Sequence, residues 1–228
     1  MKRKRFTLLD YNKQDAFEDA TRFFIVYEGE VKEPKYFQTL NSSFFEPKKA
    51  SIIHVLEKDT NVIGSQPKKL IERAKSFIKN PPKDLPITPS ADDRYRFVLD
   101  VDDHDVDEFF ELKIYCEKMV DAHLFISNIN FEVWLFFHLE EQEDLKSLTS
   151  SQMKTELGKK HTQSKIKNYP QGYLTPERIN KAIERAEKAD LNKEDYFPVE
   201  KSSKVYLLMK ELLQYSILNN DVSEFKIL

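Results

Sequence analysis

The sequence of 228 residues predicts an α/β protein with a parallel sheet of about four strands, flanked by helices and followed by a helical C-terminal part. Two observations indicate this class. Short apolar, β-rich runs alternate with longer segments of helical periodicity up to about residue 140, and such alternation is typical of right-handed βαβ crossovers. The runs are mostly apolar without a polar residue at every second position, which indicates strands buried on both faces of a parallel sheet.

Four apolar runs have the length and composition of strands. They cover residues 23–27 (F-F-I-V-Y), 51–56 (S-I-I-H-V-L), 97–99 (F-V-L) and 123–127 (H-L-F-I-S). The segments between them predict three helices, which open at Glu33-Pro34, cover residues 67–79, and follow the third strand. Residues 80–93 are rich in proline and predict a surface loop.

The second half of the chain is predicted to be helical. Residues 131–140 are apolar almost all round and predict a buried helix, residues 176–188 predict a charged surface helix, and residues 203–218 predict an amphipathic helix. The chain is expected to consist of a flexible basic N-terminal arm (residues 1–20), an α/β core (21–145) and a helical C-terminal extension that packs on the core (146–228).

The composition excludes several classes of protein. The single cysteine, Cys116, rules out an internal disulfide framework and is typical of a reducing cytoplasm. No apolar run approaches the roughly 20 residues of a membrane span, so we expect a cytoplasmic protein without a membrane partner. Four glycines cannot build a P-loop or a G-x-G-x-x-G turn. The net charge of -3 argues neither for nor against an anionic partner.

An acidic stretch follows the third predicted strand. Residues 96–105 read R-F-V-L-D-V-D-D-H-D, which places Asp100, Asp102 and Asp103 at the carboxyl end of a strand, where open α/β sheets bind ligands. Carboxylates this close repel one another unless a cation lies between them, and their hard oxygens favour Mg²⁺, Mn²⁺ or Ca²⁺ over zinc. The alternative is a solvated turn whose aspartates cap the next helix. This stretch alone leaves both interpretations open.

Acidic residues also follow two other predicted strands. Glu28 comes directly after the first strand, in E-G-E, where Gly29 permits a turn. Glu132 lies in the first turn of the helix predicted after the fourth strand. It either complements the dipole of that helix or points toward a metal at the strand ends, and both roles stay open.

A basic block follows the acidic centre. Residues 146–167 contain six lysines and one acidic residue. An acidic catalytic centre repels a polyanion, so a nucleic-acid substrate would need positive charge nearby. The alternative is a solvated helical surface. The candidates for contacts to nucleic-acid phosphates are Lys159, Lys160, Lys165 and Lys167.

Three stretches together resemble the RloB family: residues 23–40 (F-F-I-V-Y-E-G-E-V-K-E-P-K-Y-F-Q-T-L), 97–105 (F-V-L-D-V-D-D-H-D) and 127–140 (S-N-I-N-F-E-V-W-L-F-F-H-L-E). The resemblance covers residues 22 to about 140, and residues 198–212 faintly resemble the family's C-terminal segment. RloB-like proteins are encoded beside bacterial restriction-modification and other antiphage systems, and their core is similar to the Toprim fold. The resemblance therefore implies a Toprim-like, Rossmann-like sheet and a role in antiphage defence.

The resemblance also implies the residues of the site. Lys32 stands where the family often has threonine, which makes Lys32 a candidate contact to a substrate. The acidic matches are Glu28 for the Toprim glutamate, Asp100 and Asp102 for the D-x-D pair, Asp103 directly after them, and Glu33 and Glu132 as further acidic positions.

The function implied is phosphoryl transfer with Mg²⁺ or Mn²⁺, in which Glu28, Asp100, Asp102 and Asp103 bind the metal and Glu28 serves as ligand or general base. We expect a nuclease that hydrolyses DNA or RNA, with tRNA among the candidates. The alternative is a non-catalytic module that binds nucleic acid or protein in a defence or restriction-modification system. The expected partners are nucleic acid and a protein of the same operon, and the sequence leaves a homo-oligomer open.

Overall fold

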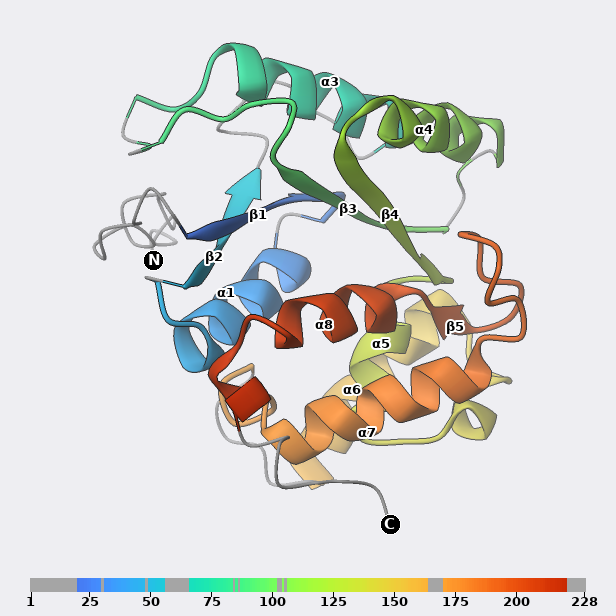
Figure 1. Cartoon of the computed structure of the whole chain (residues 1–228). Helices are drawn as coiled ribbons and strands as arrows, with labels where there is room; N and C mark the ends of the chain where they lie inside the picture. The colour runs from blue at the N-terminus through green and yellow to red at the C-terminus, as the bar shows by residue number, and fades with distance from the viewer. Residues whose placement is uncertain are drawn as a thin grey trace, which may run out of the picture.

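The computed structural model describes residues 20–29, 31–47, 49–55, 66–83, 85, 87–101, 104, 106–163 and 170–220. It shows an α/β fold in which a central sheet lies between two layers of helices (Figure 1). The predicted fold class is thereby confirmed. The N-terminal arm predicted from the sequence lies outside the described residues, except for Ala20.

The sheet has five strands in the order β2-β1-β3-β4-β5, and the first four of these run parallel. The parallel strands are β1 (Thr21–Tyr27), β2 (Ala50–Val55), β3 (Arg94–Asp100) and β4 (Asp121–Asn128). The fifth, β5 (Ser202–Ser203), pairs antiparallel with the end of β4. The arrangement is Rossmann-like, and the sheet has one strand more than the sequence predicted.

The helices cover both faces of the sheet (Figure 1). One face carries α3 (Pro67–Lys79) and α4 (Val106–Lys118), and the other carries α1 (Lys32–Phe44), α5 (Glu132–Phe137) and α8 (Val205–Leu213). Next to α5 lie α6 (Ser150–Gln163) and α7 (Pro176–Ala189), and short 3₁₀ helices occupy Gln142–Leu145 and Ile217–Asn220. Within the described part of the chain, no helix combines the length and the apolar character needed to cross a membrane.

Strand β1 is buried on both faces, as its continuous apolar run predicted. Phe23 and Ile25 belong to the apolar cluster on the α1 side, whereas Phe24 and Val26 belong to the cluster on the α3 side. Successive side chains of a strand point to opposite faces, so a strand with two helical layers needs apolar residues at every position. Cys116 of α4 is also buried, and it packs in the cluster on the α3 side.

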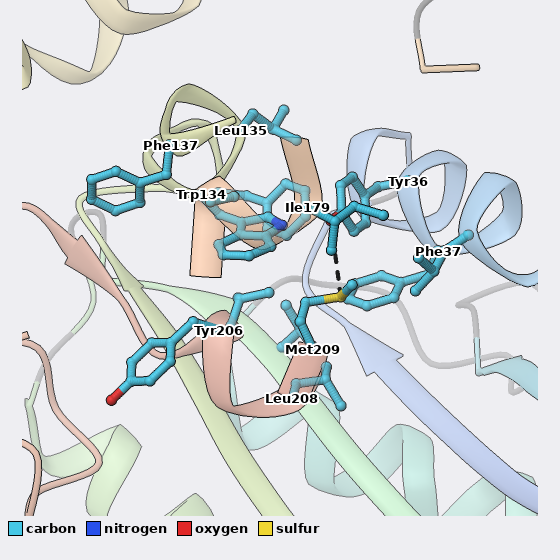
Figure 2. Packing of buried hydrophobic residues seen from close by; sticks show 14 of the residues in the cluster. Tyr36, Phe37, Trp134, Leu135, Phe137, Ile179, Tyr206, Leu208 and Met209 are labelled. Atoms are coloured by element: carbon cyan, nitrogen blue, oxygen red, sulfur yellow. Dashed lines mark hydrogen bonds between the residues drawn. The ribbon is translucent and has the colours of Figure 1, made fainter. Parts of the chain in front are cut away.

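Aromatic and aliphatic side chains join α1, α5, α7 and α8 in the larger cluster (Figure 2). His138 packs among them, where its Nδ1 lies 3.1 Å from the carbonyl oxygen of Trp134 and its Nε2 lies 3.1 Å from the Tyr36 hydroxyl. Because a carbonyl only accepts, Nδ1 carries the proton and Nε2 accepts from Tyr36. Burial lowers the pKa of His138 to about 3, so the ring stays neutral.

Helix α7 is the charged surface helix that the sequence predicted, and it also has an apolar face that the prediction did not note. One face of it is buried, through Ile179, Ala182, Ile183, Ala186 and Ala189. Alanine has a small side chain, so its contribution to an apolar face is easily overlooked between charged neighbours. The helix packs with this face against α5 and α8.

The strand order creates a topological switch point between β1 and β3. The chain leaves β1 toward β2 on one side, and it returns to form β3 on the other side of β1. The crossover helices α1 and α3 therefore lie on opposite faces of the sheet. In open α/β sheets, the crevice at the carboxyl ends of two such strands is where ligands bind.

Candidate metal site at the carboxyl ends of β1 and β3

Glu28 and Asp100 lie at this switch point. The backbone N–H of Glu28 continues the pairing of β1 with β3 and donates to the carbonyl oxygen of Val98 (3.1 Å). The Glu28 carboxylate then reaches across the strand end, where its Oε2 accepts a hydrogen bond from the backbone N–H of Asp100 (3.0 Å). The Asp100 residue is buried, with 9% of its surface exposed. Two of the predicted site residues therefore lie side by side.

The donor atoms at this edge suit a hard divalent cation. Glu28 and Asp100 supply carboxylate oxygens, the ligands that Mg²⁺ and Mn²⁺ prefer. Asp102 and Asp103 follow directly on the chain but lie outside the described residues. Within the described ranges, no group of three or more His, Cys, Asp or Glu side chains is arranged to hold a metal. Mg²⁺ usually keeps several waters and is held by one or two carboxylates, so Glu28 and Asp100 suffice to begin a site, and Asp102 and Asp103 stay predicted ligands.

His104 is a member of the site that the sequence prediction did not assign. Its Nε2 lies 3.0 Å from Oε1 of Glu28, and its Nδ1 lies 3.8 Å from Oε2 of Glu108. Since a carboxylate only accepts, His104 donates the hydrogen bond and orients the Glu28 carboxylate from the side opposite Asp100. The only signal in the sequence was its position within D-D-H-D.

Glu33 reaches the same site from the first turn of α1. Its carboxyl group lies over Gly29, where a Cβ atom would clash with the Glu33 carboxyl group unless that side chain shifted, so glycine allows this close approach. Burial of Glu33 raises its pKa to about 7, and the negative charge of Glu28 adds to the rise. The ammonium groups of Lys32 and Lys154 oppose the rise. A carboxyl group whose pKa is perturbed by burial and by a neighbouring charge is a candidate for a functional site.

This raised pKa predicts how stability depends on pH. Without metal, the folded protein keeps the Glu33 proton up to about pH 7, whereas the unfolded chain loses it near pH 4.5. Stability relative to Glu33→Gln should therefore fall as pH rises from 4.5 through 7, by up to about 3 kcal/mol. Urea unfolding of both proteins in chelator across this range measures the difference. Parallel stability curves would contradict the raised pKa.

Lys32 and Glu132 form an ion pair between the starts of α1 and α5. The Glu132 side chain is 3% exposed and the Lys32 side chain 40% exposed, so the lysine covers a buried carboxylate. Lys32 therefore neutralises the Glu132 carboxylate, which also lies in the first turn of its own helix. The pair also engages the ammonium group of Lys32, which was predicted to contact a substrate.

Much of the basic block is engaged in ion pairs on the surface. Lys159 pairs with Glu156 of the same helix, and Lys160 pairs with Glu140, which follows α5. Lys146 pairs with Glu143 in the same way. Lys165 and Lys167 lie outside the described residues. Two of the partners, Glu140 and Glu143, lie just before the block in the sequence, so the count of acidic residues within the block did not include them.

The fold and the site together define a class: an α/β protein with a Rossmann-like parallel sheet and adjacent carboxylates at its switch point. The family model for RloB-like protein matches residues 23–212. The chain therefore belongs to the RloB-like family. The match includes α6 and α7, so it extends well beyond the three stretches that resembled the family in the sequence. No curated protein and no solved structure matches the chain.

Proposed function

We propose that this protein is a metal-dependent nuclease of Toprim type that acts on DNA or RNA, with tRNA among the candidates, in bacterial antiphage defence. The observation that carries the proposal is the pairing of Glu28 with Asp100 at the switch point of the sheet. Membership of the RloB-like family supports it, since the two carboxylates stand at the positions that match the Toprim glutamate and the first aspartate of the D-x-D pair.

In this proposal, different residues have different roles in hydrolysis. Glu28, Asp100, Asp102 and Asp103 would hold Mg²⁺ or Mn²⁺, which neutralises charge that develops on a scissile phosphate. Buried carboxylates of like charge without a cation would be costly, which favours a bound metal. Glu28 serves as ligand or general base, and the hydrogen bond from His104 fixes the direction of its carboxylate.

The hydrogen bond between His104 and Glu28 also favours a second candidate. Both oxygens of the Glu28 carboxylate accept hydrogen bonds from protein groups, His104 and the backbone N–H of Asp100, without a metal. A non-catalytic module could keep the fold in this way and bind a nucleic acid or a protein of a defence or restriction-modification system. The two candidates differ in whether cleavage accompanies binding.

Asp100→Asn separates the two candidates. Purified wild-type protein should cleave plasmid, single-stranded DNA or total RNA with Mg²⁺ or Mn²⁺ but not with chelator, and Asp100→Asn should not cleave. The metals should also raise the melting temperature of the wild type, because a ligand that binds only the folded state stabilises it by mass action. The shift should be much smaller in Asp100→Asn. Without metal, the variant should be at least as stable as the wild type, since it removes repulsion with Glu28.

An exposed aspartate, Asp92, provides the matched control variant. Asp92→Asn changes the same functional group in the loop before β3, so it should keep both cleavage and the metal-induced shift. Equal shifts in wild type and Asp100→Asn would exclude a metal at Asp100. A normal shift in the wild type without cleavage of any nucleic acid would favour the non-catalytic module.

A further inference from the structure

We propose that Lys154 of α6 binds a backbone phosphate of the nucleic-acid substrate beside the carboxylates, so that the helical C-terminal part forms one wall of the substrate-binding site. This inference rests on the proposed function, because it assigns a role to Lys154 at the same site. It differs from the assignment made from the sequence, which selected lysines later in the basic block.

The start of α6 is tied to the carboxyl edge of the sheet. Asn130, in the turn that follows β4, is fully buried and donates a hydrogen bond from its Nδ2 to the Ser150 hydroxyl (2.7 Å). Ser150 is the first residue of α6. Lys154 follows it by four residues, and residues four apart lie on the same face of a helix. The face of α6 that carries Lys154 therefore begins at the strand ends.

The charge of Lys154 acts on the site. Its ammonium group is close enough to Glu33 to lower the pKa of that carboxyl group, together with Lys32. Glu33 in turn lies over Gly29, next to Glu28. Lys154 thus belongs to the electrostatic surroundings of the carboxylates, although it comes from the helical part of the chain.

Lys154 is also available to bind an anion. Its side chain is exposed, and no carboxylate of the described residues lies within 4.0 Å of its ammonium group. Lys146, Lys159 and Lys160 of the same block each have such a partner. Lys32 is paired with Glu132. An unpaired cation beside an acidic site can offset the repulsion between that site and a polyanion.

The test is binding of labelled single-stranded DNA and RNA of one sequence, in chelator, by fluorescence anisotropy over a series of salt concentrations. Lys154→Gln should weaken binding roughly three- to tenfold, and it should lower the magnitude of the log-log salt slope by about 0.7, the amount expected for one phosphate contact on a single strand. Lys154→Arg should restore the slope. Lys159→Gln is the matched control, because it changes an exposed lysine of the same helix that is already paired with Glu156.

Several results would overturn the assignment. The slope of Lys154→Gln could equal that of the wild type, or Lys159→Gln could lower the slope as much as Lys154→Gln does. A wild type that binds neither probe would also exclude a phosphate contact at Lys154. The proposed nuclease fails on a separate observation, the absence of metal-dependent cleavage. If the wild type binds with a Lys154-dependent salt slope but cleaves no nucleic acid, the phosphate contact of Lys154 stands and the proposed nuclease activity is wrong.

Discussion

Glu28→Gln is expected to lower the nuclease activity by roughly two orders of magnitude or more, the usual size of a lost acid–base contribution. Glutamine has the same shape, and its carbonyl oxygen can still accept from the backbone N–H of Asp100. It lacks the negative charge that a metal ligand or a base requires. Cleavage rates at saturating substrate, measured with Mg²⁺ and Mn²⁺, give the size of the loss.

Binding and stability controls show whether the loss of activity is local. Substrate affinity should change little, because the anisotropy assay in chelator does not depend on the metal. Glu46→Gln provides the matched control, since Glu46 is an exposed glutamate that precedes β2 at the opposite edge of the sheet. It should cleave like the wild type. Near-normal cleavage by Glu28→Gln would remove Glu28 from the chemistry and leave the aspartates as the remaining candidates.

Lys204→Met is expected to lower the free energy of unfolding by roughly 3–5 kcal/mol, the cost of breaking a buried ion pair from one side. The Lys204 ammonium donates to Asp190 Oδ1 (2.8 Å), to Asp190 Oδ2 (2.6 Å) and to the carbonyl oxygen of Asn192 (2.6 Å). Both side chains of the pair are 1% exposed. Without Lys204, the Asp190 carboxylate loses its cation and keeps hydrogen bonds from the Tyr206 hydroxyl (2.9 Å) and the backbone N–H of Asn192 (3.3 Å).

Urea unfolding of three variants tests this prediction. Lys210→Met removes an ion pair with Glu187 at the surface, where the two side chains are 42% and 38% exposed, and its stability should stay within about 1 kcal/mol of the wild type. The double variant Lys204→Met with Asp190→Leu should recover most of the loss, because it leaves no unpaired buried charge. A loss in Lys204→Met no larger than that in Lys210→Met would show that the pair contributes little.

The parallel sheet could be predicted because its signals are local. Each strand is a short apolar run, and α3 begins and ends at the residues that the helical periodicity indicated, Pro67 and Lys79. The same is true of the carboxylates at the strand ends. Glu28 and Asp100 follow the first and third strands directly, and the rule that ligands bind at the carboxyl ends of parallel strands predicts that they meet.

The short strand β5 could not be predicted in this way. It consists of two serines, Ser202 and Ser203, which have no apolar pattern. Its pairing is held by the tertiary structure: the hydroxyls of Ser203 and Ser127 lie 2.9 Å apart, and the backbone N–H of Lys204 donates to the carbonyl oxygen of Ile126 (2.8 Å). The partners are more than 70 residues apart in the chain, so no sequence window contains both.

The sequence by itself determined the fold class and the carboxylates that follow the strands, because apolar periodicity and turn residues act within a few positions of the chain. The strand order, and with it the switch point between β1 and β3, came from the tertiary structure. Only the tertiary structure decided which charges pair. His104 reaches Glu28, Lys32 covers Glu132, and the lysines of the basic block differ in whether a carboxylate is near. Ion pairs and hydrogen bonds depend on distances of a few ångströms between segments that packing brings together, and the order of residues along the chain does not contain those distances.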